Sequence, residues 1–329
     1  MQRSTDRIVF VGPTDQASPW LLRALARCEA QFAALCESDA DRAERAAAEH
    51  HARWPHHDLA AMLAETRPRA VVVAAPPAER AAVIRACLAG GASVLVVGAP
   101  PPQPAGRRAP RGRGIVWGAA PLRFAPAVEL MLRLIESGKM APLLSISLSE
   151  TRCRTARLPE EAAWPLGRDP LFDLVDLLRA VAGPFREVFA RGHPDGALHA
   201  VLVTRDDVPI SLEARAHGRP DAESLRMELR GGEGSLLTLD GDMRLRCDVS
   251  GRTVASHAPG FARSDPTIEH GWLGWINEFL RRVRDPRGAA ADDWQESVRT
   301  VEVLLAALSR AAAVPLDRAR RASRGAIAT

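Results

Sequence analysis

Three aspartates, Asp169, Asp173 and Asp176, stand at i, i+4 and i+7 in a stretch with helical spacing. Side chains at these separations share one face of a helix. Asp173 could act as a general base if burial raised its pKa toward neutrality, or the three carboxylates could hold a divalent cation, which prefers oxygen ligands. The structural alternative is that Asp169, followed by Pro170, caps the helix, and that Asp173 only favours the positive end of the helix dipole.

A second candidate site is the turn after the first strand-like run. A dinucleotide-binding loop has the pattern G-x-G-x-x-G/A, in which the second glycine lets the backbone approach the pyrophosphate. Residues 12–17 supply Gly12 and Ala17 at the outer positions, but Thr14 puts a branched side chain at the middle one. Asp15 adds a negative charge beside the expected diphosphate, at a cost of about 1 kcal/mol in water and about 4 kcal/mol at an effective dielectric near 20. The stretch is therefore either a dinucleotide loop or a plain strand-to-helix turn.

Glu37 ends the second strand-like run, where an acidic residue hydrogen-bonds the ribose in dinucleotide-binding folds. A carboxylate there favours NAD over NADP, because it repels a 2′-phosphate. The alternative is an ordinary solvated carboxylate at a strand end. Arg42 is expected to pair with Asp39 on the helix that follows.

Strands and helices alternate through the first third of the chain. Apolar runs at residues 7–12, 31–37, 69–75, 93–97 and 115–118 are separated by stretches with helical spacing. This order predicts a Rossmann-type, doubly wound parallel sheet over residues 1–119. It is interrupted by an irregular loop rich in proline and arginine at residues 100–114.

The character of the sequence changes near residue 120. Runs of alternating polarity dominate between residues 143 and 239, and closing helices are expected at 272–283 and 292–312. The pattern predicts an α+β domain at residues 120–315 with a large, mainly antiparallel sheet. Residues 316–329 are expected to form a basic, flexible tail.

The order of these elements resembles the glucose–fructose oxidoreductase / inositol dehydrogenase / MocA family over nearly the whole chain. The local matches are Glu37, Ala75-Pro76-Pro77, the run at residues 87–96, Arg123-Phe124-Ala125-Pro126 and the turn at residues 231–235. The resemblance implies NAD(P) binding in the first domain and chemistry on sugars, polyols or small carbonyl compounds. It assigns cofactor contacts to Gly12, Thr14, Ala17, Glu37, Ala75, Pro76, Pro77, Gly98 and Arg123.

The catalytic residues that the resemblance implies are replaced in this chain. The family's Glu-Lys-Pro motif reads Gly98-Ala99-Pro100, and Asp173 stands where the family has a histidine. The single lysine of the chain, Lys139, follows a helix in a turn that is expected to be exposed. Loss of one positioned acid–base group costs about 10² to 10⁴ in rate. The first hypothesis is therefore a catalytically impaired or repurposed member with a ligand-binding or accessory role, for which both retention and loss of the cofactor stay open. The alternative is an active NAD-dependent enzyme that uses Asp173.

Composition narrows the class of protein further. Five scattered cysteines without a CxxC pair predict reduced thiols in a cytoplasm, and no apolar run is long enough to span a membrane. The basic runs at residues 107–113 and 318–324 lack interleaved aromatic residues, so no nucleic-acid partner is expected. His50, His51, His56 and His57 are expected in a solvated loop without a metal. A small-molecule ligand and a homo-oligomer, formed through the C-terminal sheet as in the family, are the expected partners.

Overall fold

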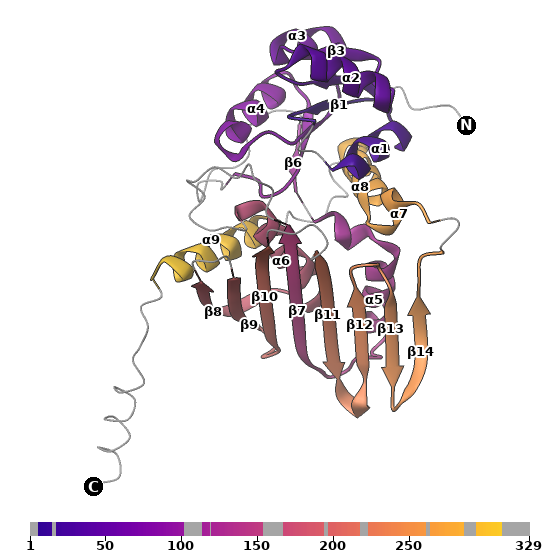
Figure 1. Cartoon of the computed structure of the whole chain (residues 1–329), viewed down its shortest axis with the longest axis vertical. Coiled ribbons are helices and arrows are strands. Elements are labelled where there is room, and N and C mark those ends of the chain that lie inside the picture. The colour runs from indigo at the N-terminus through magenta and orange to yellow at the C-terminus, as the bar shows by residue number, and fades with distance from the viewer. Residues whose placement is uncertain are drawn as a thin grey trace.

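The computed structural model of the chain describes residues 6–14, 18–101, 114–118, 120–153, 167–193, 197–217, 223–260, 264–285 and 294–310. Within these ranges the chain forms two sheets, one above the other in Figure 1, with the N-terminal sheet at the top. The predicted loop at residues 100–114, apart from its ends, and the predicted tail lie outside the described residues, as do Asp15 and Ala17.

The N-terminal sheet is parallel and has the strand order β3-β2-β1-β4-β5-β6. Its strands are β1 (Arg7–Val11), β2 (Gln31–Cys36), β3 (Trp54–His56), β4 (Ala70–Val73), β5 (Ser93–Val96) and β6 (Val116–Trp117). Helices α1 (Pro19–Arg27), α2 (Ala40–His50), α3 (Leu59–Thr66) and α4 (Pro77–Ala89) connect them. The inner strands are buried on both faces, which explains their continuous apolar sequences. The predicted Rossmann-type sheet is confirmed.

The second sheet has eight strands in the order β14-β13-β12-β11-β7-β10-β9-β8. They are β7 (Leu143–Cys153), β8 (Phe185–His193), β9 (Ala197–Thr204), β10 (Pro209–His217), β11 (Ser224–Gly231), β12 (Leu236–Asp240), β13 (Leu245–Val249) and β14 (Arg252–His257). All neighbours pair antiparallel except β7 and β10, which are parallel. The sheet is therefore mixed but mainly antiparallel, as predicted.

Helices cover one face of this second sheet. The 3-10 turn η1 (Pro121–Phe124) leads into α5 (Pro126–Glu136), which lies behind the sheet in Figure 1 together with α6 (Arg168–Ala182) and α9 (Trp294–Arg310). Alternate residues of the strands, such as Ile146 and Leu148 of β7, are buried against these helices. A short 3-10 turn, η3 (Gly232–Gly234), links β11 and β12.

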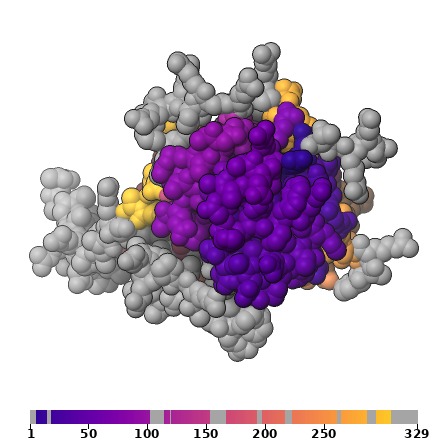
Figure 2. All heavy atoms as spheres, turned by 90° about the horizontal axis from the view of Figure 1, so that it is seen from above, coloured from indigo at the N-terminus to yellow at the C-terminus, as the bar shows by residue number. Residues whose placement is uncertain are grey.

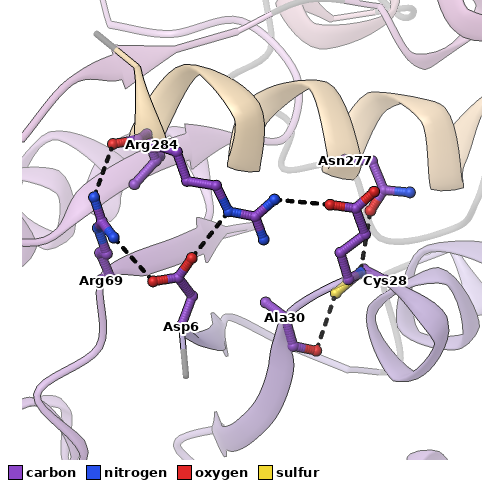
Figure 3. Close-up of polar contacts among 8 residues, drawn as sticks. Asp6, Cys28, Ala30, Arg69, Asn277 and Arg284 are labelled. Atoms are coloured by element: carbon purple, nitrogen blue, oxygen red, sulfur yellow. Dashed lines mark hydrogen bonds and ion pairs between the residues drawn. The ribbon is translucent and has the colours of Figure 1, made fainter. Parts of the chain in front are cut away.

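The chain returns to the first sheet near its end. After α7 (Pro266–Glu269), helix α8 (Trp272–Arg284) packs beside α1. Arg284 pairs with Asp6 at 3.0 Å, as Figure 3 shows. It also pairs with Glu29 at 2.7 Å, and Asn277 accepts a hydrogen bond from the Glu29 backbone N–H. Asp6 also pairs with Arg69. Seen from above in Figure 2, the N-terminal residues form the face of the molecule, with parts of α8 and α9 emerging at its edges.

Several sequence predictions are corrected by the structure. Strands β3, β13 and β14 were not expected. His50 ends α2 and is buried, and His56 belongs to β3, so the histidine cluster is not simply a solvated loop. Among the described helices, none has both the length and the apolarity needed to cross a membrane.

Candidate functional site

The centre of the candidate site is a pair of hydrogen bonds between the two halves of the chain. Arg80, on α4, donates from Nη1 and Nη2 to the two carboxylate oxygens of Asp169, on α6, at 2.7 Å each. Arg80 also donates to the carbonyls of Ala75 and Ala99, at 3.1 and 2.8 Å. Its side chain is 5% exposed. One guanidinium thus joins the ends of β4 and β5 to the start of α6.

Gly98 makes room for this arrangement. Its φ is +77°, and a Cβ at this position would lie 2.4 Å from the Asp169 carboxyl carbon. The next backbone N–H, of Ala99, donates to Asp169 at 2.9 Å. Ala99 is the position that the resemblance assigns to a lysine, and it is buried, with its N–H and C=O both bonded. The backbone groups of Ala99, just after β5, therefore bind Asp169 and its partner Arg80.

One helical turn further on, Asp173 lies near two residues of β7. Arg152 forms an ion pair with Glu150 at 2.8 Å, and its Nη2 lies 3.7 Å from Asp173 Oδ2. Desolvation raises the pKa of Asp173 to about 7, with Arg152 opposing the shift and Asp169, Glu150 and Asp176 adding to it. Desolvation raises the pKa of Glu150 as well, again against Arg152. Asp173 therefore has the ionisation that a general base at neutral pH requires.

The third aspartate has a different environment. Asp176 is fully buried and accepts hydrogen bonds from the Ala120 N–H, the Ser297 hydroxyl and Arg123, at 2.8, 2.9 and 3.3 Å. It anchors η1 and α9 to α6, which is a structural role. Arg123, an expected cofactor contact, is here the ion-pair partner of Asp176.

The three aspartates thus share a helix face but have separate partners. Among the described residues, no three His, Cys, Asp or Glu side chains gather as a metal-binding group. The predicted N-cap role of Asp169 is wrong, because Gly167 precedes the first residue of α6 and Asp169 lies within its first turn. Its carboxylate is drawn away from the helix end by Arg80 and the Ala99 N–H.

The turn after β1 forms hydrogen bonds with the buried side chain of Glu37. Gly12 has a φ of +143° and lies so close to Ala74 that a Cβ would come within 2.8 Å of its carbonyl carbon. Glu37 accepts hydrogen bonds from the Thr14 N–H at 2.7 Å and from the Thr14 hydroxyl at 3.3 Å. Ser38 and Arg42 donate to its other oxygen. Glu37 is 2% exposed, so the alternative interpretation, an ordinary solvated carboxylate at a strand end, is wrong. The expected contact of Arg42 with Asp39 is present at 3.7 Å, but Arg42 also pairs with Glu37.

Two residues that follow β4 shape the same edge of the sheet. Pro76 precedes α4 and Pro77 is its first residue, which suits the missing N–H of proline at a helix start. The carbonyl of Ala75 accepts from Arg80. Gly12, Glu37, Ala75 and Gly98 all follow parallel strands at their carboxyl ends, the edge at which open α/β sheets bind ligands.

Sequence reasoning missed Arg80, Glu150 and Arg152. Glu150 and Arg152 could have been noticed, because they continue the alternation of Ile146 and Leu148 into positions that should be apolar. Arg80 had no such signal, since one arginine in a helix is ordinary. Lys139 is exposed, as expected.

Comparison with known proteins supports the interpretation of the first sheet as a Rossmann-type fold. Residues 7–96 match the family model for the glucose–fructose oxidoreductase / inositol dehydrogenase / MocA proteins, described as an oxidoreductase family with an NAD-binding Rossmann fold. No curated protein matches the sequence.

The whole chain is also similar to solved structures. A dehydrogenase from Chromobacterium violaceum aligns with a TM-score of 0.74 and 19% identity, over 98% of each chain. Levoglucosan dehydrogenase in complex with NADH and levoglucosan aligns with a TM-score of 0.71 and 15% identity, over 93% of this chain and 98% of that one. An oxidoreductase from Agrobacterium radiobacter in complex with NAD⁺, L-tartaric acid and magnesium gives 0.70 and 12%, over 93% and 97%. The chain has the fold of these three solved structures.

The residues present fit a dinucleotide at one end of the site only. The Gly12 turn suits a nucleotide. Glu37 follows the strand at which a ribose is expected, but its carboxylate is buried and accepts hydrogen bonds from Thr14, Ser38 and Arg42. Ala99 and Asp173, where the resemblance places a lysine and a histidine, do not reproduce the family's proton-handling groups. No hydride-transfer step is therefore derived for this chain.

Proposed function

We propose that the chain belongs to the glucose–fructose oxidoreductase / inositol dehydrogenase / MocA family and is a repurposed member that binds a small sugar-like or polyol-like ligand. The first sheet would be a nucleotide-binding domain, and the boundary between the domains would fall near residue 120. The levoglucosan, sorbose and tartaric acid complexes of similar structures support a small, hydroxyl-rich ligand.

The proposal depends mainly on Ala99, which stands where the resemblance places a lysine. A side chain that could donate a proton is missing there, and the backbone is used to hold Asp169 and Arg80. Loss of two positioned acid–base groups is expected to reduce turnover severely. Binding, in contrast, needs only the shaped edge of the sheet and its polar groups.

A second candidate function is an active NAD-dependent dehydrogenase in which Asp173 accepts the proton of a ligand hydroxyl. The pKa of Asp173, raised to about 7 by desolvation, favours this alternative. A carboxyl with that pKa is partly deprotonated at neutral pH and can act as a base.

Titration of the purified chain with NADH and NADPH, followed by fluorescence or calorimetry, tests both candidates. Submicromolar binding together with polyol-dependent reduction of NAD⁺ that disappears in Asp173→Asn would establish the second candidate and overturn the first. A preference for NADH over NADPH would support the role expected of Glu37, whose carboxylate would repel a 2′-phosphate. If neither NADH nor NADPH bound detectably at millimolar concentration, the dehydrogenase would be excluded and only the ligand-binding function would remain.

We also propose that the outer face of the second sheet mediates self-association in a cytoplasmic protein. Phe189 and Val201 are cross-strand neighbours on this face and are 59% and 44% exposed. A hollow of about 280 Å³ beside them is lined in part by Ser145, Ser147 and Ser211.

The proposed cytoplasmic location is supported by the cysteines. The free thiols among the described residues, which a reducing compartment favours, are Cys28, Cys36, Cys87 and Cys247.

A further inference from the structure

The strand order of the first sheet divides its carboxyl edge into two halves. In the order β3-β2-β1-β4-β5-β6, strands β1 to β3 lie on one side of the reversal point and strands β4 to β6 on the other. A dinucleotide on such a sheet lies across that point, with one nucleotide on each half. The turns after β1 and β2, with Gly12 and Glu37, form the adenosine half-site, because the pyrophosphate and the first ribose are expected there. The turns after β4, β5 and β6 form the nicotinamide half-site.

The nicotinamide half-site is covered by helix α6. Three side chains of this helix, at i, i+3 and i+7, contact the turns after β5 and β6. Asp169 binds the turn after β5. Phe172 is fully buried and lies 3.7 Å from the Cβ position of Gly118, which follows β6. Asp176 accepts a hydrogen bond from the Ala120 N–H.

Asp169 fills the space above Gly98. This glycine follows β5 and has a φ of +77°. Glycine lets another group approach the backbone closely because it has no Cβ. Here the approaching group is the Asp169 carboxyl, whose carbon would lie 2.4 Å from an added Cβ. A cofactor ring therefore has no room on this turn while the carboxylate remains.

The backbone groups of the nicotinamide half-site are bonded within the chain as well. A carboxamide such as that of nicotinamide has an acceptor oxygen and two N–H donors, which need partners when they leave water. At this edge the carbonyls of Ala75 and Ala99 accept from Arg80 at 3.1 and 2.8 Å, and the Ala99 N–H donates to Asp169 at 2.9 Å. Displacing Asp169 would leave the guanidinium of Arg80, which is 5% exposed, without its anion.

The adenosine half-site is not closed by α6 in this way. The Glu37 carboxylate accepts hydrogen bonds from Thr14, Ser38 and Arg42, which all belong to the same half of the sheet. Gly12 and Thr14 remain partly exposed. This half-site also lies within the segment that matches the NAD-binding family model. The two half-sites therefore differ in what they can accept.

We propose that Asp169 is an internal occupant of the nicotinamide half-site and that the chain binds a nucleotide through its adenosine half alone. The ligand class of the first sheet is then an adenosine diphosphate, either free or as part of a larger molecule such as ADP-ribose. NADH binds by the same part and keeps its nicotinamide ring in solvent. This inference rests on the nucleotide-binding part of the proposed function, because it names which half of a dinucleotide is bound.

A series of cofactor fragments tests the proposal with the full chain. In calorimetry, ADP-ribose and NADH are expected to bind within about threefold of each other, and nicotinamide mononucleotide is expected not to bind at millimolar concentration. A chain that uses both half-sites would instead bind NADH at least about tenfold more tightly than ADP-ribose. Saturation-transfer NMR with NAD⁺ gives a second readout, in which the adenine protons receive saturation from the protein and the nicotinamide protons do not.

Two variants assign the effect to Asp169. Asp169→Gly opens the space above Gly98 and frees the Ala99 N–H, so NADH should gain at least about tenfold over ADP-ribose. Because this change strands Arg80, the double variant Arg80→Met with Asp169→Gly removes the buried charge together with the carboxylate. Glu129→Gln, which alters an exposed pair with Arg133, is the control and should keep the wild-type ratio. Thermal unfolding shows which variants are folded.

The outcomes separate this inference from the proposed function. Binding of nicotinamide mononucleotide, a wild-type preference of about tenfold for NADH over ADP-ribose, or folded variants at Asp169 that keep the wild-type ratio would each overturn the internal occupant and leave the nucleotide-binding domain in place. Failure of every nucleotide to bind at millimolar concentration would overturn both. Calorimetry with sorbitol, measured separately, decides whether the polyol-binding function stands.

Discussion

Arg80 and Asp169 meet through two parallel hydrogen bonds of 2.7 Å, although 89 residues separate them in the chain. The pair joins α4 of the first sheet to α6, which packs on the second. Arg80 also bonds the carbonyls that follow β4 and β5. Three segments that the sequence marks as separate motifs are therefore held by one side chain.

Removal of either partner of this pair is expected to destabilise the chain strongly. Arg80 is almost fully buried, so Arg80→Ala leaves the Asp169 carboxylate without its cation, and Asp169→Asn leaves a buried guanidinium uncompensated. Such losses cost about 3–5 kcal/mol. Denaturant unfolding of each variant measures the change.

A double-mutant cycle distinguishes the pair from its surroundings. Arg80→Ala combined with Asp169→Asn should cost less than the sum of the single changes, because each single change strands the other partner. Glu129→Gln breaks an exposed pair with Arg133 and should change stability by less than about 1 kcal/mol. Strict additivity of the two buried changes would show that the pair does not couple the two halves.

Gly98 provides a second prediction about the same junction. Gly98→Ala should be destabilising by more than Gly91→Ala, although both glycines have a positive φ, +77° and +82°. An added methyl at Gly98 collides with Asp169, whereas at Gly91 nothing lies within 4 Å. The Gly91 change should therefore cost only the backbone term, about 1 kcal/mol, and the Gly98 change several times that. Equal shifts in denaturation midpoint would mean that Asp169 can move aside at no cost.

The stability of the chain should depend on pH through Asp173. In the unfolded chain this carboxyl loses its proton near its ordinary value of 3.8, whereas in the folded chain it keeps it until about 7. The folded state binds more protons in this window, so stability falls as the pH rises from about 4 to about 7, by up to about 4 kcal/mol. Asp173→Asn removes this loss and should be more stable than the wild type at about pH 8 but not at about pH 4. A constant difference across the range, measured by denaturant unfolding, would contradict it.

The sequence predicts the first sheet well because its strands are buried on both faces and read as apolar runs. It fails at β3, whose three residues include Pro55, and at β13 and β14, where exposed charges and short length obscure the alternation. The parallel pairing of β7 with β10 is not written in either strand, since alternation fixes the buried face but not the neighbour.

The candidate site is predicted less completely for a related reason. Helical spacing places Asp169, Asp173 and Asp176 on one face, as the structure shows, but their partners come from elements far away in the chain. Arg80 and Arg123 form ion pairs with two of them, and only the fold reveals that Arg152, at 3.7 Å, is the cation that the described residues place near Asp173. Helical spacing describes one helix at a time. The ion pairs of its aspartates, in contrast, depend on every element that packs against that helix.

The outer face of the second sheet yields a prediction about association. Phe189→Glu should shift the chain toward the monomer in analytical ultracentrifugation, because it places a charge in the centre of an exposed apolar pair with Val201. Val303→Glu, on α9, alters a residue of similar exposure away from this face and should leave the distribution unchanged. A wild-type chain that is monomeric at all concentrations would contradict self-association altogether.

The last prediction concerns Thr14 and the binding of a dinucleotide. The Thr14 N–H and hydroxyl both donate to Glu37. Thr14 also occupies the motif position at which a glycine lets the backbone of a dinucleotide loop approach the pyrophosphate. Thr14→Gly removes the branched Cβ and keeps the N–H bond to Glu37, and it should tighten NADH binding at least about tenfold in a fluorescence titration. Thr14→Val keeps the branching and loses only the hydroxyl, so it should bind NADH no better than the wild type. If both variants tightened binding equally, the hydroxyl bond to Glu37 would be the obstacle instead of the branch. If neither did, the barrier would lie beyond Thr14, and the negative charge of Asp15 in the same turn would become the residue to replace.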